Sequence, residues 1–196
     1  MSLRLKHTSF WFIRHGQTRY NAAGLAQGAL DIELNEQGYA QAQAAAPLLL
    51  ARGITEIVTS PLSRARETAE SLNRVLHLPL RVEADLREVS FGELEGQPSS
   101  PWLADFMQGR FTPQGGESFA DLKCRIESVL ARILATTTAP VLIVAHGVVL
   151  RAVQSLLALD HDVPLGNAVP LYFQPIASGW QMTEAGLSSE VFENTP

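Results

Sequence analysis

The stretch "FWFIRHGQT", residues 10–18, decides the fold that the sequence predicts. Four apolar residues, Phe10 to Ile13, run directly into Arg14, His15 and Gly16. A short apolar run rich in aromatic and β-branched side chains is typical of a buried β-strand. A buried strand does not account for the cation, the imidazole and the glycine that end it. These three residues therefore mark either an ordinary loop or a functional site.

Short apolar runs alternate along the chain with longer segments of helical periodicity. This alternation predicts an α/β fold, a three-layer domain with a mostly parallel central sheet and helices on both faces. The run "VLIVA", residues 141–145, is continuously apolar, as expected of a strand buried on both faces. The predicted strands are Ser9–Ile13, Glu56–Thr59, Leu80–Glu83, Val141–Ala145, Val169–Phe173 and Trp180–Thr183, and the predicted helices are Glu36–Ala51, Pro61–Leu76, Ser118–Thr136 and Val148–Leu159.

Composition limits the class of protein. The 196 residues, 46% of them hydrophobic, can form one domain with its own core, so we predict a single domain over residues 1–196. One cysteine, Cys124, excludes an internal disulfide. No apolar stretch approaches the ~20 residues of a membrane span, and a net charge of −5 without a basic block argues against nucleic acid. We expect a cytoplasmic protein with neither membrane nor nucleic acid as its partner; the oligomeric state stays open.

Local signals mark two helix starts and one interrupted segment. Ser60-Pro61 predicts an N-cap followed by proline at the first helical position, and Ser118 predicts a second N-cap. Residues 97–117, broken by prolines and glycines, contain a short apolar helix that either packs on the core or forms a short lid over a site. If this segment is a lid, the side chains expected to face the substrate are Trp102, Phe106 and Phe111.

Arginine or histidine follows the ends of three predicted strands, Ser9–Ile13, Glu56–Thr59 and Val141–Ala145. In an open parallel sheet, ligands bind beyond the carboxyl ends of the strands. If the three strands are neighbours, two arginines and two histidines meet at one edge, and burying like charges is costly unless an anion joins them. Arginine is well shaped to bind phosphate, and the helix N-termini after Ser60 and Gly147 are expected to add anion affinity. The sequence therefore predicts a phosphate site made by Arg14, His15, Arg64 and His146.

The predicted site contains a nucleophile and a candidate acid. A neutral His15 beside a phosphate can attack phosphorus and form a covalent intermediate. Nearby arginines disfavour the protonated imidazole, so the attacking nitrogen stays available near neutral pH. The leaving oxygen then needs a proton, which a carboxylic acid with a raised pKa can donate. By spacing alone, the candidates in "DLREVSFGELEG" are nearly equal: Glu88, Glu93 and Glu95.

Five motifs follow one another along the chain: "RHGQTRYN", "SPLSRARETA", "LREVSFGELEG", "PQGGES" and "VAHG". In this order and spacing they resemble the histidine phosphatase superfamily, in the branch of the cofactor-dependent phosphoglycerate mutases, fructose-2,6-bisphosphatase and α-ribazole phosphatase. The resemblance spans about Phe10 to Leu150. It implies a phosphoglycerate mutase-like fold and phosphoryl chemistry that needs neither a metal nor another cofactor.

The resemblance also implies roles for single residues. His15 is then the residue that becomes phosphorylated, and Glu88 is the acid and base, a choice among the three glutamates that spacing did not make. Arg14, Arg64 and His146 are implied to hold the phosphoryl oxygens. The implied substrate-binding residues are Asn21, Gln27, Gly28 and Gly147.

Departures from the mutases favour hydrolysis over transfer. Val89 and Ala29 stand where the mutases carry an arginine and a bulky aromatic residue, and Arg110 is the only cation in residues 97–117, where they carry paired arginines. We therefore predict a phosphatase that hydrolyses small phosphomonoesters, with a small phosphorylated metabolite as its partner. Phosphoglycerate mutase-type phosphotransfer is the alternative. The motifs do not choose between α-ribazole phosphatase and a broad-specificity enzyme.

Two further classes remain as alternatives. His15, His146 and Glu88 could form a two-histidine, one-carboxylate metal site in a metal-dependent hydrolase. Arg14 and Arg64 argue against it, because they would repel a divalent cation at the same place. The other alternative is a non-catalytic module that only binds phosphate.

Overall fold

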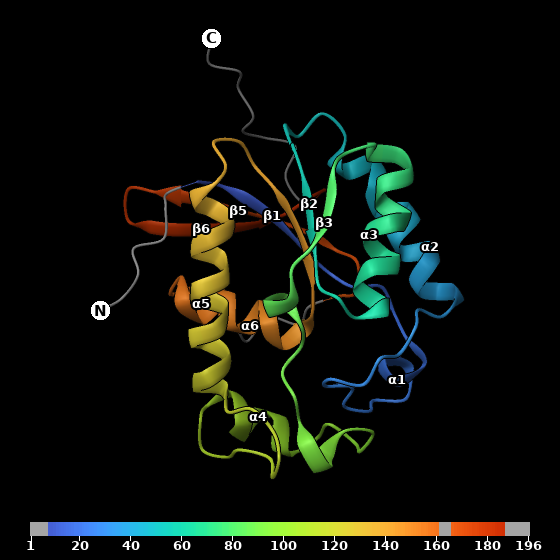
Figure 1. The fold of residues 1–196 in the computed structure, drawn as a ribbon, viewed down its shortest axis with the longest axis vertical. Helices are drawn as coiled ribbons and strands as arrows, with labels where there is room; N and C mark the ends of the chain where they lie inside the picture. The colour runs from blue at the N-terminus through green and yellow to red at the C-terminus, as the bar shows by residue number, and fades with distance from the viewer. Residues whose placement is uncertain (1–7, 161–165, 187–196) are drawn as a thin grey trace.

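A single mixed sheet organises the part of the chain that the computed structural model describes, residues 8–160 and 166–186 (Figure 1). The strand order is β3-β2-β4-β1-β5-β6. The strands are β1 Phe10–Arg14, β2 Ile57–Thr59, β3 Leu80–Val82, β4 Leu142–Ala145, β5 Pro170–Ile176 and β6 Gly179–Glu184. β1, β4, β2 and β3 pair in parallel, whereas β5 pairs antiparallel with β1 and β6 pairs antiparallel with β5. The predicted mostly parallel sheet is confirmed, because the two antiparallel pairings lie on one side of β1.

Helices cover both faces of this sheet, as predicted. Figure 1 shows α2 and α3 on one side of the strands and α5 and α6 on the other. No helix among residues 8–160 and 166–186 is long and apolar enough to cross a membrane. The α-helices are α1 Arg19–Ala22, α2 Glu36–Ala45, α3 Ser63–Leu76, α4 Trp102–Met107, α5 Phe119–Ala135 and α6 Gly147–Leu156, and the 3-10 turns are η1 Ala46–Leu49, η2 Ala84–Leu86 and η3 Gly92–Leu94.

Strand β1 is continuously apolar because both of its faces are buried. Phe10 and Phe12 belong to the core cluster that α5 and α6 complete. Trp11 and Ile13 point to the opposite cluster, which α3 and η1 complete. Successive side chains of a strand alternate between faces, so one five-residue strand joins the two halves of the core. The carboxyl end of β1 is thereby fixed in the middle of the sheet.

Several predicted helix bounds were wrong for local reasons. α2 ends at Ala45 instead of Ala51, and the chain continues as the 3-10 turn that contains Pro47, which has no N–H to extend an α-helix. α3 begins at Ser63 instead of Pro61, with Leu62 as an extended N-cap residue. The N-cap predicted at Ser118 is confirmed, since its side chain accepts a hydrogen bond from the backbone of Asp121.

The segment between residues 97 and 117 packs its short helix on the core. Phe106 of α4 is fully buried, and its ring lies 5.4 Å from that of Phe91 and 5.8 Å from that of Phe119. Arg110, the cation of this segment, pairs with Asp105 at the surface. One of the two predicted arrangements, a helix packed on the core, is therefore confirmed.

Candidate active site

The carboxyl ends of the neighbouring parallel strands β2, β4 and β1 lie side by side, and together they form the carboxyl edge of the sheet. β4 lies between β1 and β2, and the backbone N–H of His15 donates to Ala145 O at 2.9 Å. The rings of His15 and His146, which follow β1 and β4, lie with their centroids 5.3 Å apart. The predicted neighbourhood of the two histidines follows from this strand order.

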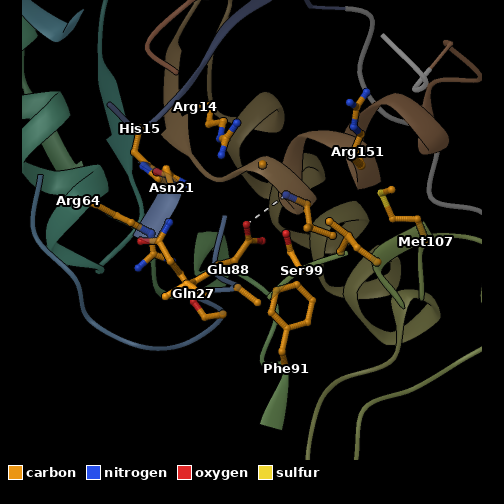
Figure 2. Close-up of a pocket in the computed structure, with 16 residues that line it drawn as sticks. Arg14, His15, Asn21, Gln27, Arg64, Glu88, Phe91, Ser99, Met107 and Arg151 are labelled. Atoms are coloured by element: carbon orange, nitrogen blue, oxygen red, sulfur yellow. Dashed lines mark hydrogen bonds between the residues drawn. The ribbon is translucent and has the colours of Figure 1, made fainter. Parts of the chain in front are cut away.

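A cavity of about 300 Å³ opens at this edge (Figure 2). The structure places eight of the nine predicted site residues along it; the ninth, His146, is fully buried and does not line it. Figure 2 shows His15, Arg64 and Asn21 together at one end, away from Met107 and Arg151. The cavity is lined by Arg14, His15, Asn21, Leu25, Ala26, Gln27, Gly28, Arg64, Glu88, Phe91, Ser99, Leu103, Met107, Gly147, Val148 and Arg151.

The protonation of His15 follows from its hydrogen bond. Its Nδ1 lies 2.7 Å from the carbonyl oxygen of Gly16. A carbonyl oxygen only accepts hydrogen bonds, so Nδ1 carries the proton and Nε2 keeps its lone pair. Burial and the charges of Arg64 and Arg14 hold the pKa of His15 well below 6.5, against the opposing effect of the Gly16 bond. The ring is therefore neutral near pH 7, with Nε2 as its nucleophilic atom.

Close packing after β1 explains why Gly16 follows the arginine and the histidine. A Cβ at this position would lie 2.4 Å from the carbonyl oxygen of Gly38 in α2, so only glycine fits. The N–H of Gly16 donates to Thr68 Oγ1 of α3 at 2.9 Å. The chain after β1 is thus pressed against two helices, and this close packing fixes His15 in place.

Arg64 carries a buried positive charge and also hydrogen-bonds to the loop at Gly28 and Leu30. Its Nη1 donates to Leu30 O at 2.7 Å and its Nη2 to Gly28 O at 2.8 Å. The side chain is fully buried, and within the described residues its Nε has no hydrogen-bond partner. Burial lowers the pKa of Arg64 to about 10, with Glu88 opposing the shift, so the guanidinium stays charged at neutral pH. Arg64 therefore brings a buried positive charge and positions the loop that contains Gln27 and Gly28.

The side-chain carboxylate of Glu88 lies against the N-terminus of α6. Its carboxylate accepts hydrogen bonds from the backbone N–H groups of Val148 at 3.1 Å, Val149 at 3.2 Å and Val89 at 3.0 Å. Figure 2 marks the first of these with a dashed line. Burial raises its pKa above 4.5 and outweighs the opposing effects of these bonds and of the charges of Arg64 and Arg14. A carboxyl with a raised pKa suits a group that donates and accepts a proton.

Side-chain carboxylates already accept hydrogen bonds at both helix N-termini that were expected to add anion affinity. The N–H groups of Val148 and Val149 at the start of α6 donate to Glu88. At the start of α3, the N–H of Ser63 donates to Asp31 Oδ1 at 2.7 Å. Because side-chain carboxylates occupy these three donors, the arginines are the groups that bring a full positive charge to the cavity.

Arg14 and Gly147 fit each other. A Cβ at Gly147 would lie 3.3 Å from Arg14 Nε, so the glycine leaves room for the guanidinium. Burial lowers the pKa of Arg14, with Glu88 opposing the shift. The resemblance implied a substrate contact for Gly147, and the structure adds this contact with Arg14.

A hydrogen-bonded group connects the remaining predicted residues. Thr18 Oγ1 donates to Gln27 Oε1 at 3.0 Å and lies 3.2 Å from Asn21 Oδ1. Asn167 Nδ2 donates to His15 O at 2.9 Å. The sequence interpretation missed Thr18 and Asn167, because neither stands at a strand end.

Comparison with known proteins decides the family. The model of the histidine phosphatase superfamily (branch 1) matches residues 10–171. The chain belongs to the histidine phosphatase superfamily. The resemblance found in the five motifs is thereby confirmed.

Individual relatives within this superfamily carry phosphatase and mutase names. A glucosyl-3-phosphoglycerate phosphatase of Mycobacterium tuberculosis is 36% identical over 172 residues, covering 79% of this chain and 76% of its own. A Photorhabdus laumondii protein named "Probable phosphoglycerate mutase GpmB" is 33% identical over 199 residues, covering 90% and 91%. The solved structure of a mycobacterial glucosyl-3-phosphoglycerate phosphatase with VO3 has a TM-score of 0.79 at 33% identity, covering 92% of this chain and 100% of that chain.

The cavity of this histidine phosphatase has an outer end, formed by Leu103 and Met107, that does not contain the aromatic side chains predicted for a lid. Leu103 and Met107 of α4 line the cavity, and they share a helix face because they are four residues apart. Phe106 points into the core, and Trp102 and Phe111 contact each other outside the cavity lining. The prediction that these three aromatic side chains face the substrate was wrong.

Arg151 was also missed by the sequence interpretation. It lines the cavity from α6, and its Nη1 donates to Gln154 Oε1 at 3.3 Å. Its position four residues after Gly147, on the helix that starts at the sheet edge, is the signal that could have identified it.

The alternative of a metal site finds no ligand set here. Across residues 8–160 and 166–186, no three or more His, Cys, Asp or Glu side chains are grouped so that they could hold a metal ion. His15, His146 and Glu88 all belong to these residues and do not form such a group.

Proposed function

We propose that this member of the histidine phosphatase superfamily hydrolyses small phosphomonoesters through a phosphohistidine on His15. The observation that carries the proposal is the bond from His15 Nδ1 to Gly16 O, which leaves Nε2 as the free, neutral nucleophile. Arg14, Arg64 and Glu88 line the same cavity. A phosphatase name on a relative 36% identical supports the same reaction class.

In the first step, His15 Nε2 attacks phosphorus, and the bond from phosphorus to the ester oxygen breaks. A protonated Glu88 gives its proton to the leaving oxygen, which departs as the alcohol. Arg14 and Arg64 supply two positive charges for a phosphate group that carries about −1.5 to −2 at neutral pH. His146 and the amide nitrogen of Asn21 are the further donors that we assign to the phosphoryl oxygens.

In the second step, water attacks the phosphohistidine. The Glu88 carboxylate takes a proton from this water, the bond between phosphorus and Nε2 breaks, and inorganic phosphate leaves. The site returns to its starting protonation state, so the cycle needs neither a metal nor an external base.

The segment after Glu88 favours water over a second phosphoglycerate as the acceptor. Arg110 pairs with Asp105 and does not line the cavity. Val89 is fully buried in the core and carries no charge. This segment therefore offers no cation to bind an acceptor carboxylate, and Leu103 and Met107 give the cavity an apolar wall. The cation near that wall is Arg151, which lines the cavity from α6.

Two reactions on one preparation test this proposal. We expect hydrolysis of small aryl and alkyl phosphates to be far faster than interconversion of 2- and 3-phosphoglycerate with added 2,3-bisphosphoglycerate. A His15→Ala preparation measures contaminating phosphatase. Efficient interconversion with negligible phosphate release would overturn the proposal in favour of the mutase. Activity lost on EDTA treatment and restored by one divalent metal would favour the metal-dependent alternative.

A further inference from the structure

A buried hydrogen bond joins the ends of β2 and β4. His146 Nε2 lies 2.6 Å from Ser60 Oγ, and both residues are fully buried. The other ring nitrogen, His146 Nδ1, is also buried and has no hydrogen-bond partner in the described part of the chain. A buried polar atom without a partner needs an explanation, and the direction of the Ser60 bond supplies one.

The contacts of Ser60 favour one direction for this bond. A hydroxyl group has one proton to donate and two lone pairs that accept. The backbone N–H of Leu62 already donates to Ser60 Oγ at 3.3 Å. If His146 Nε2 also donated, the hydroxyl proton would have no acceptor, since Ser60 Oγ makes no other hydrogen bond with residues 8–160 and 166–186. Donation from Ser60 to Nε2 satisfies both groups and leaves the imidazole proton on Nδ1.

The surroundings of His146 make this choice matter. Burial, followed by the charges of Arg64, His15 and Arg14, holds the pKa of His146 well below 6.5. The ring is therefore neutral and carries a single proton. With that proton on Nδ1 the buried nitrogen attracts an anion, whereas without it a lone pair would repel the anion.

We propose that Ser60 is a positioning residue that holds neutral His146 as the Nδ1–H tautomer, so that this N–H donates to a phosphoryl oxygen. The tautomer assignment stands on the Ser60 contacts, and the donor role rests on the proposed function. His146 lies beside the nucleophile, 5.3 Å between ring centroids. Ser60 thereby determines whether the second histidine of the site favours or opposes phosphate.

The tautomer can be measured without any activity. Long-range ¹H–¹⁵N correlation spectra of the full chain with labelled histidine distinguish a protonated from an unprotonated ring nitrogen, and His146→Asn identifies the His146 signals. We expect Nδ1 to be protonated and Nε2 unprotonated in the wild-type protein. The reverse assignment would overturn the proposal.

Orthovanadate tests the donor role. Since His146 does not line the cavity in the free protein, the titration asks whether a bound oxyanion reaches Nδ1. We expect the Nδ1–H signal to shift as vanadate binds, and an unchanged signal in saturated protein would overturn the donor role. Protein with the Nδ1–H tautomer but no vanadate binding would support the Ser60 assignment and overturn both the donor role and the proposed function.

Two variants separate positioning from stability. Ser60→Ala should abolish the Nδ1–H preference, weaken vanadate binding and lower kcat by roughly 10- to 100-fold. This is less than the ~100- to 1,000-fold of removing a donor outright, because the imidazole itself remains. Ser60→Thr keeps the hydroxyl and should restore the spectrum and most of the affinity. Thermal unfolding of both variants reports any structural loss. A Ser60→Ala protein with the wild-type spectrum and wild-type vanadate affinity would overturn the role of Ser60.

Discussion

The two ends of the cavity are built by different means. At the inner end, His15, Arg64 and Glu88 are buried and bonded to backbone atoms around the strand ends. At the outer end, Leu103 and Met107 are only partly buried and stand on a six-residue helix. Under the proposed function, we infer from this difference that the inner end carries out the reaction and that the outer end selects the ester. The five predictions below test this division, from the largest expected effect to the smallest.

Removing the nucleophile should abolish the reaction. His15→Ala should lower kcat by roughly ten-thousand-fold or more, the scale seen when a covalent nucleophile is removed. Acid-labile labelling by a phosphate donor should disappear with it, because both need Nε2. The measurements are steady-state hydrolysis and phosphohistidine labelling.

The matched control is His77→Asn. His77 is exposed and ends α3 in the left-handed conformation, which asparagine tolerates. It should keep wild-type rates. If His15→Ala still turned over substrate and was still labelled, the nucleophile would be another residue, and the role given to the inner end of the cavity would be wrong.

Arg64→Lys should lower kcat/KM by roughly 100-fold, the usual scale for losing one preorganised charge-stabilising group. Lysine keeps a charge but cannot donate to Gly28 O and Leu30 O from a rigid planar fork. Rates and phosphate inhibition constants measure the effect. Arg66→Lys, at an exposed position of the same helix that pairs with Glu70, is the control and should change little. A wild-type rate in Arg64→Lys would show that the two guanidinium hydrogen bonds to Gly28 O and Leu30 O are not needed for activity.

Glu88→Gln should slow substrates according to their leaving groups. Alkyl phosphates need a proton on the departing oxygen, so we expect a loss of about 100-fold for them and less than about 10-fold for aryl phosphates. Glu93→Gln, an exposed neighbour in the same loop, should have no effect. Equal losses across the leaving groups would count against Glu88 as the acid.

The pH profile gives the same assignment with a definite sign. The raised pKa of Glu88 keeps it protonated to higher pH than an ordinary glutamate, so alkyl phosphate hydrolysis should fall as pH rises through that pKa. Glu88→Gln should remove this alkaline limb. The lowered pKa of His15 places the acid limb below pH 6.5, because His15 is active only when neutral.

Changes at the outer end should be small and selective. Leu103→Ala and Met107→Ala each remove apolar contact area, and we expect KM for bulky apolar esters to rise about 3- to 10-fold with kcat little changed. Small alkyl phosphates should be affected least. Ala104→Ser, at an exposed position of the same helix, is the control. A large loss of kcat with every ester would contradict the division between the two ends.

The sequence predicted the inner end well because its parts are contiguous with strand ends. Arg14-His15 and His146-Gly147 directly follow apolar runs, and parallel neighbouring strands bring such endings together. What it could not show was which donors were already occupied: Glu88 takes the N–H groups at the start of α6, a contact across 60 residues of chain. Such contacts depend on tertiary packing, which no local pattern encodes.

The outer end was predicted less well for a different reason. α4 is apolar around most of its circumference, so periodicity alone cannot say which side faces the cavity. Ring contacts of Phe106 with Phe91 and Phe119 settle the rotation of the helix. Leu103 and Met107 are left to line the cavity, and the aromatic wall expected from the sequence does not form.

The two bonds from Arg64 to the loop at Gly28 and Leu30 also limit how this protein can diversify. An insertion or a bulky replacement in that loop would displace the guanidinium that we propose binds the phosphate, so we expect a change in substrate choice there to bring a loss of rate. Leu103 and Met107 of α4 have apolar side chains, so replacing them removes no comparable hydrogen bond to a charged residue. Evolution, natural or in the laboratory, can therefore explore new esters at positions 103 and 107 while the chemistry stays intact.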